Sequence, residues 1–175
     1  MTNKEQITLA MQHLAKKKKV VFLGENIINS GRIYGTLDKV STRKCIEMPV
    51  AENLIAGTAI GLALEGYHPV CIFQRMDFML IAADQIINHA CLIPKMSGDS
   101  VVLPIIFRTI KAKLSSDFWV GHQHSKDLTH VFRPYMPVYE VPKYANAEEA
   151  YEAAYKLNKP VLVVEDYKHY GKEAK

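Results

Sequence analysis

The sequence predicts an α/β protein with a single doubly wound, mostly parallel sheet and helices on both faces. Four short apolar runs rich in branched residues are typical of strands buried on both sides, at residues 20–23, 69–73, 104–107 and 160–164. Between them lie segments with apolar residues at helical spacing. Strands that alternate with helices favour a parallel sheet whose ligands bind at the carboxyl ends of the strands.

Four helices are predicted from the spacing of apolar residues. The first runs from Lys4 to Lys17 and has one apolar face, and the fourth, Ala147–Leu157, is plainly amphipathic. The second, Glu52–Leu64, is too apolar for a surface helix and is expected to lie against a neighbouring sheet or subunit. The third is expected from Phe78 to Leu92.

One connection does not follow this alternation of strand and helix. The segment Thr109–Ser125 is both polar and aromatic, follows a predicted strand and is longer than an ordinary connection. Long loops at the carboxyl edge are usually functional or mobile. Lys111, Lys113 and Trp119 can face a phosphorylated or acidic substrate there, although lysines on a loop are often merely solvated.

Composition and charge indicate a globular chain. The 175 residues, of which 49% are hydrophobic and 23% charged, predict one domain over residues 1–175. Much of the net charge of +4 comes from the run Lys16–Lys19, which suits the end of the first helix. A nucleic-acid patch is the alternative, but no nucleic-acid motif accompanies the run, so no nucleic acid is expected as a partner.

Cysteine usage and the N-terminal sequence bear on metal binding, disulfides and membrane association. Cys45, Cys71 and Cys91 are far apart and form no metal-ligand or disulfide pattern, so no metal site is expected in this chain. No apolar run resembles a signal peptide or a membrane span. No membrane association and a cytoplasmic location are therefore expected.

Three features can carry chemistry, and each has a plainer alternative. Glu52 opens an apolar helix just beyond a strand, where a carboxylate is also favoured as a cap. His122 and His124 can relay protons near pH 7, although loop histidines are often solvated. Phe73 and Phe78 flank a strand-to-helix turn, as core residues or as a ligand platform. None of the three decides the function alone.

In order along the chain, these segments resemble the beta subunit of the pyruvate and branched-chain 2-oxo acid dehydrogenases and, more distantly, the central domain of transketolases. The resemblance covers roughly residues 20–171. It rests on four stretches: VFLGENI followed by GRIYG, MPVAENLIAGTAIGLALEGYHPV, FMLIAADQIINHACLIPKMSG, and PIIFR followed by QHS. The resemblance implies the pyrimidine-binding domain of thiamine-diphosphate enzymes, which is a doubly wound parallel sheet.

The resemblance implies a role for each candidate residue. Glu52 matches the cofactor-activating glutamate, whose carboxyl group on the aminopyrimidine ring nitrogen favours the imino tautomer that takes the thiazolium proton. Phe78 matches the aromatic residue that packs on the pyrimidine, and Glu25 an acidic residue near the cofactor. His124 matches a substrate-facing histidine, and His122 is expected beside it.

The apolar residues near Glu52 in the sequence are expected to affect its protonation. Val50, Leu54 and Ile55 are expected to surround Glu52 and to favour its protonated form, with Val50 also beside the cofactor.

Where the sequence departs from the family, it implies a partner chain. The family's diphosphate motif begins Gly-Asp-Gly and ends in asparagine, and Ser97-Gly98-Asp99-Ser100 is followed by no matching asparagine. We therefore expect a separate subunit to hold the diphosphate and Mg²⁺. No C-terminal transketolase domain is expected either, which favours a free-standing decarboxylase or a ketol-transferring enzyme over membership of a dehydrogenase complex.

Three functions remain open at this stage. The first is a subunit of a split thiamine-diphosphate enzyme that cleaves or transfers a two-carbon or acyl unit from a 2-oxo acid or ketose. The second is transketolase-like ketol transfer between sugar phosphates, and the third is a non-catalytic scaffold or regulatory domain with the same fold. Either enzyme is expected to be a dimer or heterotetramer, with the helix after Glu52 as the contact.

Overall fold

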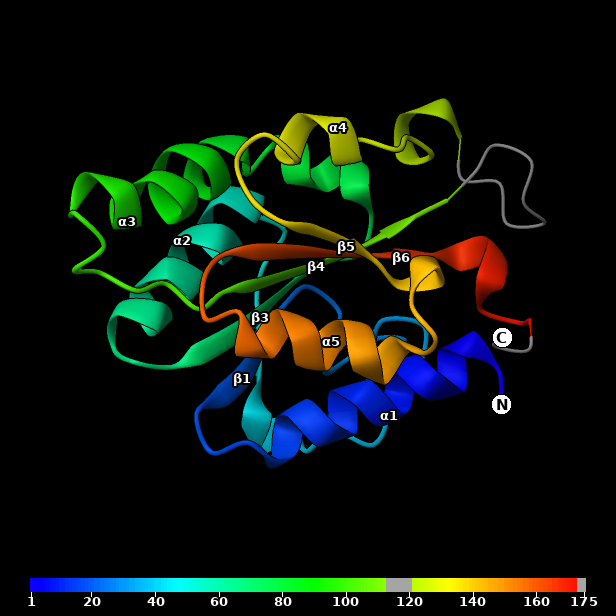
Figure 1. Ribbon diagram of the computed structural model, residues 1–175. Coiled ribbons are helices and arrows are strands. Elements are labelled where there is room, and N and C mark those ends of the chain that lie inside the picture. Colours follow the sequence, from blue (N-terminus) through cyan, green and yellow to red (C-terminus); the bar gives the residue numbers. More distant parts are fainter. Residues whose placement is uncertain (113–120, 173–175) are drawn as a thin grey trace.

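The computed structural model, described for residues 1–112 and 121–172, contains one six-stranded parallel sheet (Figure 1). The strand order is β2-β1-β3-β4-β6-β5, and every neighbouring pair is parallel. The predicted fold class is therefore confirmed. The strands are β1 (Val20–Gly24), β2 (Cys45–Glu47), β3 (His68–Phe73), β4 (Ile106–Lys111), β5 (Val138–Glu140) and β6 (Val161–Asp166).

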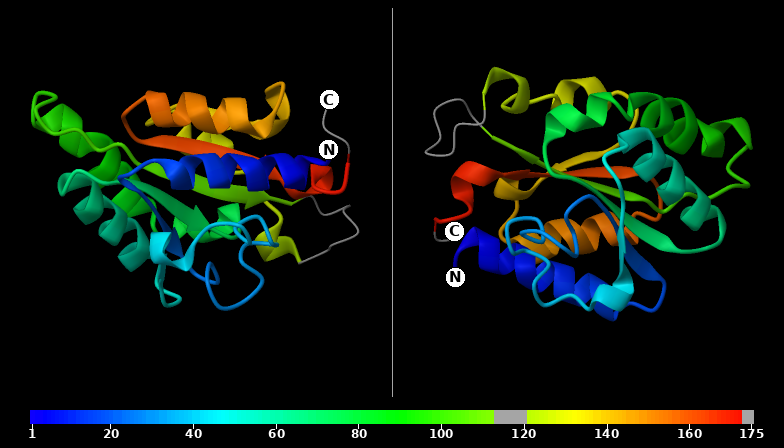
Figure 2. Two further views of the ribbon diagram at one scale, coloured as in Figure 1. Left: turned by 90° about the horizontal axis from the view of Figure 1, so that it is seen from below. Right: turned by 180° about the vertical axis from the view of Figure 1, so that it is seen from behind.

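Helices cover both faces of the sheet (Figures 1 and 2). On one face α1 (Asn3–Lys16) packs beside α5 (Ala147–Lys156), over the side chains of alternate strand residues such as Val70 and Ile72. The residues between them, such as Cys71 and Phe73, face the second core, which is built with α2 (Glu52–Leu64), α3 (Leu92–Met96) and α4 (Thr129–Phe132). Side chains that alternate between two cores explain the uninterrupted apolar strands.

The predicted helix from Phe78 to Leu92 is wrong as a single α-helix. Its place is taken by the 3₁₀ turn η2 (Met76–Leu80), the π-helical segment η3 (Gln85–Cys91) and α3. The π-helical segment ends shortly before Pro94, which has no N–H to offer the carbonyl one turn earlier. The remaining 3₁₀ turns are η1 (Thr42–Lys44), η4 (His122–His124), η5 (Val141–Lys143) and η6 (Tyr167–His169).

The lysine run lies at the end of α1, as expected. Thr2 and Glu5 form a capping box at the other end of that helix. Just beyond its last turn, the Lys44 ammonium donates to the carbonyls of Lys17, Lys18 and Val20 at 2.9, 2.9 and 3.2 Å. A cation on these carbonyls complements the negative end of the helix dipole and fixes the entry into β1.

The chain reverses its winding direction between β1 and β3, because β2 lies on one side of β1 and β3 on the other. The two strands approach closely at this point: a side chain at Gly24 would place its Cβ 2.6 Å from the Ile72 carbonyl oxygen. In doubly wound sheets, ligands bind beside such a reversal at the carboxyl ends of the strands. Across residues 1–112 and 121–172 we find no helix with the length and hydropathy needed to cross a membrane.

Candidate cofactor-binding and active site

Glu52 is the first residue of α2, close to the carboxyl edge of the sheet. Its side chain is buried, with 8% of the residue exposed. Within the described residues no group donates a hydrogen bond to its carboxyl oxygens, and Ala51 before it provides no side-chain cap. The hydrogen-bonding capacity of this buried group is thus available to a ligand.

Two further glutamates lie near Glu52. Burial raises the pKa of Glu25 above its usual value, and the charges of Glu52 and Glu47 raise it further. Glu47, at the end of β2, accepts backbone N–H bonds from Asn26 and Ile28, both at 2.6 Å. Glu47 therefore holds the loop that follows β1, while the surroundings of Glu25 favour its protonated form.

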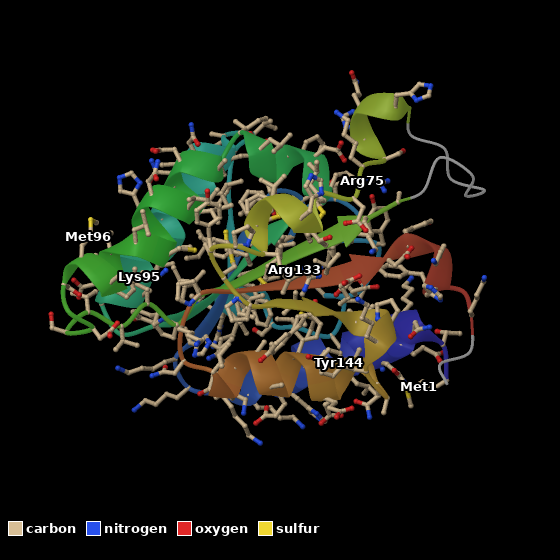
Figure 3. All side chains as sticks on the ribbon, turned by 45° about the horizontal axis from the view of Figure 1, so that its top comes forward. Met1, Arg75, Lys95, Met96, Arg133 and Tyr144 are labelled. Carbon is tan, nitrogen blue, oxygen red and sulfur yellow. The ribbon has the colours of Figure 1, made fainter. Side chains whose placement is uncertain are left out.

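The turn after β3 is tied to the loop after β1. The Gln74 amide donates to the backbone carbonyl of Glu25 at 3.2 Å. The Arg75 guanidinium lies over the rings of Tyr34 and Tyr167, at 5.5 and 5.9 Å from their centroids. Figure 3 shows Arg75 at this edge of the sheet, with Lys95 and Met96 at the opposite end. These cation–π contacts of the buried Arg75 hold the turn after β3 against the loop after β1, which carries Tyr34, and against η6, which carries Tyr167.

Phe78 and His124 meet at the same edge. Their ring centroids are 5.2 Å apart with an interplanar angle of 73°, an edge-to-face contact between η2 and η4. Gly121 has a φ of +88°, a conformation that glycine adopts without strain, and it turns the chain into η4. The structure therefore brings together two of the predicted site residues that are 46 positions apart in the sequence (124 − 78).

Other predicted residues are placed differently. His122 is exposed at the start of η4. Val50 is 72% exposed and Leu54 is 53% exposed, whereas Ile55 is buried. Of the three apolar residues expected to surround Glu52, only Ile55 is in the core of the chain by itself. Val50 and Leu54 instead form part of the outer surface next to the site.

Lys111 was one of the lysines expected to face a substrate, and the structure gives its ammonium two partners of its own. It contacts Asp127 at 2.7 Å and Glu140 at 3.1 Å. Burial would lower the pKa of Lys111, but the hydrogen bonds to these carboxylates raise it. Lys111 therefore anchors the chain after η4. Lys113 and Trp119, the other two candidates, lie outside the described residues.

Sequence reasoning missed Glu47 altogether. Its function depends on backbone groups about twenty positions earlier, and no local pattern marks such a contact. Its only signal is a charged residue at the end of a very short strand. In the part of the chain that the structure describes, no group of three or more His, Cys, Asp or Glu side chains is arranged to hold a metal ion.

Comparison with known proteins decides the family. The family model of the transketolase pyrimidine-binding domain matches residues 1–172. The chain belongs to this family. The predicted resemblance is thereby confirmed, and the pyrimidine-binding domain spans nearly the whole chain.

Curated relatives include the mitochondrial pyruvate dehydrogenase E1 component subunit beta of Homo sapiens, 31% identical over an alignment of 167 residues that covers 91% of this chain and 45% of the relative. The same subunit of Caenorhabditis elegans is 31% identical over an alignment of 179 residues, gaps included, that covers 98% of this chain and 50% of the relative. The chain thus spans about half the length of these relatives. A solved structure, the inactive beta4 tetramer of a split gene transketolase, shares the fold with a TM-score of 0.74 at 18% identity, over 95% of this chain and 51% of that one.

Proposed function

We propose that this chain is the pyrimidine-binding half of a split thiamine-diphosphate enzyme that cleaves or transfers a two-carbon or acyl unit from a 2-oxo acid or ketose. The observation that carries the proposal is Glu52: a buried carboxyl group at the start of α2, next to the sheet reversal, with no donor among the described residues. Because no described group donates to this carboxyl group, its hydrogen-bonding capacity is open to a ligand.

The residues at this edge fit the aminopyrimidine of the cofactor. Glu52 offers a carboxyl group to a ring nitrogen, and Phe78 offers an aromatic ring that is only partly covered. Glu25, whose pKa is raised by burial and by its acidic neighbours, adds a group that takes up a proton readily. These three residues suit a flat, nitrogen-containing ring. None of them is cationic, and we assign the binding of the diphosphate to the partner chain.

When bound, thiamine diphosphate supplies the carbon nucleophile and electron sink that 2-oxo acid and ketose chemistry requires. The residues of this chain bind, orient and protonate. Glu52 holds a proton at the pyrimidine ring nitrogen, and Phe78 orients the ring from its face. His124, beside Phe78, is placed to exchange a proton with a bound substrate or to steady its carboxylate.

The exposed apolar residues beside the site indicate where a partner subunit binds. Val50, Leu54 and Ile81 are 72%, 53% and 55% exposed, on or next to the elements that carry Glu52 and Phe78. On α2, a side chain at Gly61 would meet no atom within 4 Å. Apolar groups of this kind are normally covered in a subunit interface. We infer that the partner chain covers them and thereby completes the cofactor site.

Calorimetric titration of thiamine diphosphate and Mg²⁺ tests the proposal. We expect binding to this chain mixed with a diphosphate-binding chain from the same genome, and much weaker binding to this chain alone. Leu54→Asp should abolish binding in the mixture while the variant remains folded, because a charge is placed in the interface. Absence of binding in every mixture would instead favour the non-catalytic scaffold.

A substrate screen separates the two enzyme activities. Only decarboxylation of a 2-oxo acid releases carbon dioxide, whereas ketol transfer between sugar phosphates moves two carbons without gas release. The fold shared with a split gene transketolase makes ketol transfer the second candidate. We expect one class of substrate to turn over in the loaded complex and the other to be inert.

A further inference from the structure

The loop after β1 is held at two points by one side chain. Glu47, the partly buried last residue of β2, accepts the N–H groups of Asn26 and Ile28, one on each carboxyl oxygen and both at 2.6 Å. Hydrogen bonds to a carboxylate are shorter and stronger than those to a neutral acceptor. Ile27, between the two held groups, is fully buried in the core under α1 and α5. The conformation of this loop therefore depends on one carboxylate.

Asn26 connects Glu47 to Glu25. The Asn26 backbone N–H is bound by Glu47, and its side-chain amide donates to Glu25 Oε1 at 3.2 Å. The φ of Asn26 is +56°, in the left-handed region that asparagine tolerates better than most residues with a side chain. In this conformation the backbone and the side chain of one residue reach two different carboxyl groups.

The backbone of Glu25 is fixed from the other side as well. Gly24, just before it, is the last residue of β1 and has no room for a side chain beside β3. The Gln74 amide, on the turn after β3, donates to the Glu25 carbonyl at 3.2 Å. The main chain of Glu25 thus has little freedom, and the direction of its carboxyl group depends on the contact with Asn26.

We propose that Glu47 is a positioning residue of the active site: by holding the backbone of Asn26, it directs the Asn26 amide and thereby fixes the Glu25 carboxyl group beside the cofactor. What Glu25 contributes to catalysis rests on the proposed function, whereas its placement by Glu47 does not. The charged groups on the elements around Glu25 are Glu47 on β2, Glu52 on α2 and Arg75 on the turn after β3. Glu47 and Glu52 also raise the pKa of Glu25, which favours its protonated form.

The first test is amide NMR of the full chain, without partner or cofactor. The Asn26 and Ile28 amide protons should resonate downfield and should move together when acid neutralises Glu47, because a carboxylate is the stronger acceptor. In Glu47→Gln the oxygen serves one N–H group while the NH₂ faces the other. Hydrogen exchange of the released amide should then be roughly 10–100-fold faster, as expected for the loss of a hydrogen bond to a charged group.

The position of the Glu25 side chain is measured in the same chain by the three-bond couplings that report its χ1 rotamer. We expect one rotamer in the wild-type chain and an average of several in Glu47→Gln. Asn26→Gly should give the same average, because glycine adopts the left-handed backbone and retains the N–H for Glu47 but has no amide for Glu25. The couplings depend on geometry and not on the charge of Glu47.

The matched control is Glu5→Gln. Glu5 also accepts a backbone N–H, from Thr2 at 2.7 Å, but it belongs to the capping box of α1 and should leave the Glu25 couplings unchanged. A folded Glu47→Gln chain in which Glu25 keeps one rotamer overturns the proposal, as does a wild-type chain in which Glu25 samples several. If Glu47→Gln does not fold, Asn26→Gly decides instead, and an unchanged Glu25 rotamer in that variant overturns the proposal.

A double-mutant cycle in the loaded complex gives a second readout. Glu47→Gln should lower kcat by roughly 10–100-fold, because a small misplacement of an active-site group slows turnover strongly. In a Glu25→Gln background it should lower kcat no further, because Glu47 acts through Glu25. Losses that multiply would mark Glu47 as merely structural and overturn its positioning role. If no substrate is turned over, the proposed function fails, yet the couplings still decide whether Glu47 positions Glu25.

Discussion

Glu165 and Glu52 are both buried carboxylates, but they lie in very different surroundings. Glu165, at the end of β6 and fully buried, accepts from Arg108 Nε at 2.9 Å and Nη2 at 3.0 Å, and from the hydroxyls of Tyr151 and Tyr170. Glu52 accepts from no group in the described residues. The first carboxylate is saturated within the chain and the second is not.

This difference separates a structural carboxylate from a functional one. Burial would lower the pKa of Arg108, but Glu165 and the two tyrosines raise it, so the guanidinium stays charged inside the core. The same guanidinium also donates to Thr36 at 2.7 Å and so fixes the loop after β1 to the sheet. A carboxylate with all its partners holds the fold together, whereas one without them is ready for a ligand.

The largest expected effect is that of Glu52→Gln on activity. An amide cannot hold the proton that the carboxyl group holds, so kcat of the loaded complex should fall roughly 10²–10⁴-fold. Stability should change by less than about 0.5 kcal/mol, since no internal hydrogen bond is lost. Glu65→Gln, at the exposed end of the same helix, is the matched control and should retain wild-type kcat. Full activity of Glu52→Gln would contradict the assigned role.

The second prediction concerns stability rather than activity. Glu165→Gln leaves the Arg108 charge buried without its counter-ion, so the free energy of unfolding should fall by about 3–5 kcal/mol. Urea denaturation measures it. Glu148→Gln removes a half-exposed carboxylate that pairs with His13 and should cost less than about 1 kcal/mol. Equal losses in the two variants would show that the network is not a major source of stability.

A third prediction concerns Glu25, which has fewer partners than Glu165 but more than Glu52. Burial and the neighbouring glutamates raise its pKa, so its ionisation destabilises the folded chain at pH values above the unfolded-state pKa. Glu25→Gln should therefore stabilise the chain at pH 7, by a few tenths of a kcal/mol after solvent screening, and make no difference near pH 4. Denaturation at the two pH values checks this. A destabilised variant at pH 7 would contradict it.

Elements with long, regular patterns could be predicted from the sequence. The bounds predicted for the first, second and fourth helices agree with α1, α2 and α5 to within one residue. The three-residue strands β2 and β5 were missed, because both lie at sheet edges, are only partly buried and have no continuous apolar run. β4 begins after Pro104 rather than at it and continues through polar residues to Lys111.

Only part of the site could be predicted from the sequence. Glu52, Phe78 and His124 came from the family resemblance, and the structure places Phe78 against His124. Glu47 and the Arg108–Glu165 network could not be found, since each depends on contacts between distant segments. Periodicity identifies which residues are buried, but not which polar groups meet once they are buried.

The smallest effect is expected at Asp127, a carboxylate that has partners but is exposed. Burial would raise its pKa, but hydrogen bonds from Lys111 and Thr129 lower it to about 2 from an ordinary 3.8. A lowered pKa stabilises the fold above the unfolded-state pKa, and this contribution is lost as the pH falls from about 4 toward 2. Because the side chain is 48% exposed, solvent screening keeps the gain below about 0.5 kcal/mol.

Asp127→Asn should therefore lower the Tm by only about 1–2 °C at pH 7, and the difference from the wild-type chain should narrow below pH 4. Thermal melts at steps between pH 7 and pH 3 measure it. A difference that stays constant down to pH 3 would mean that the hydrogen bonds to Thr129, rather than the charge, carry the effect. A loss as large as that of Glu165→Gln would show that hydrogen-bond partners alone, without burial, make a carboxylate structural.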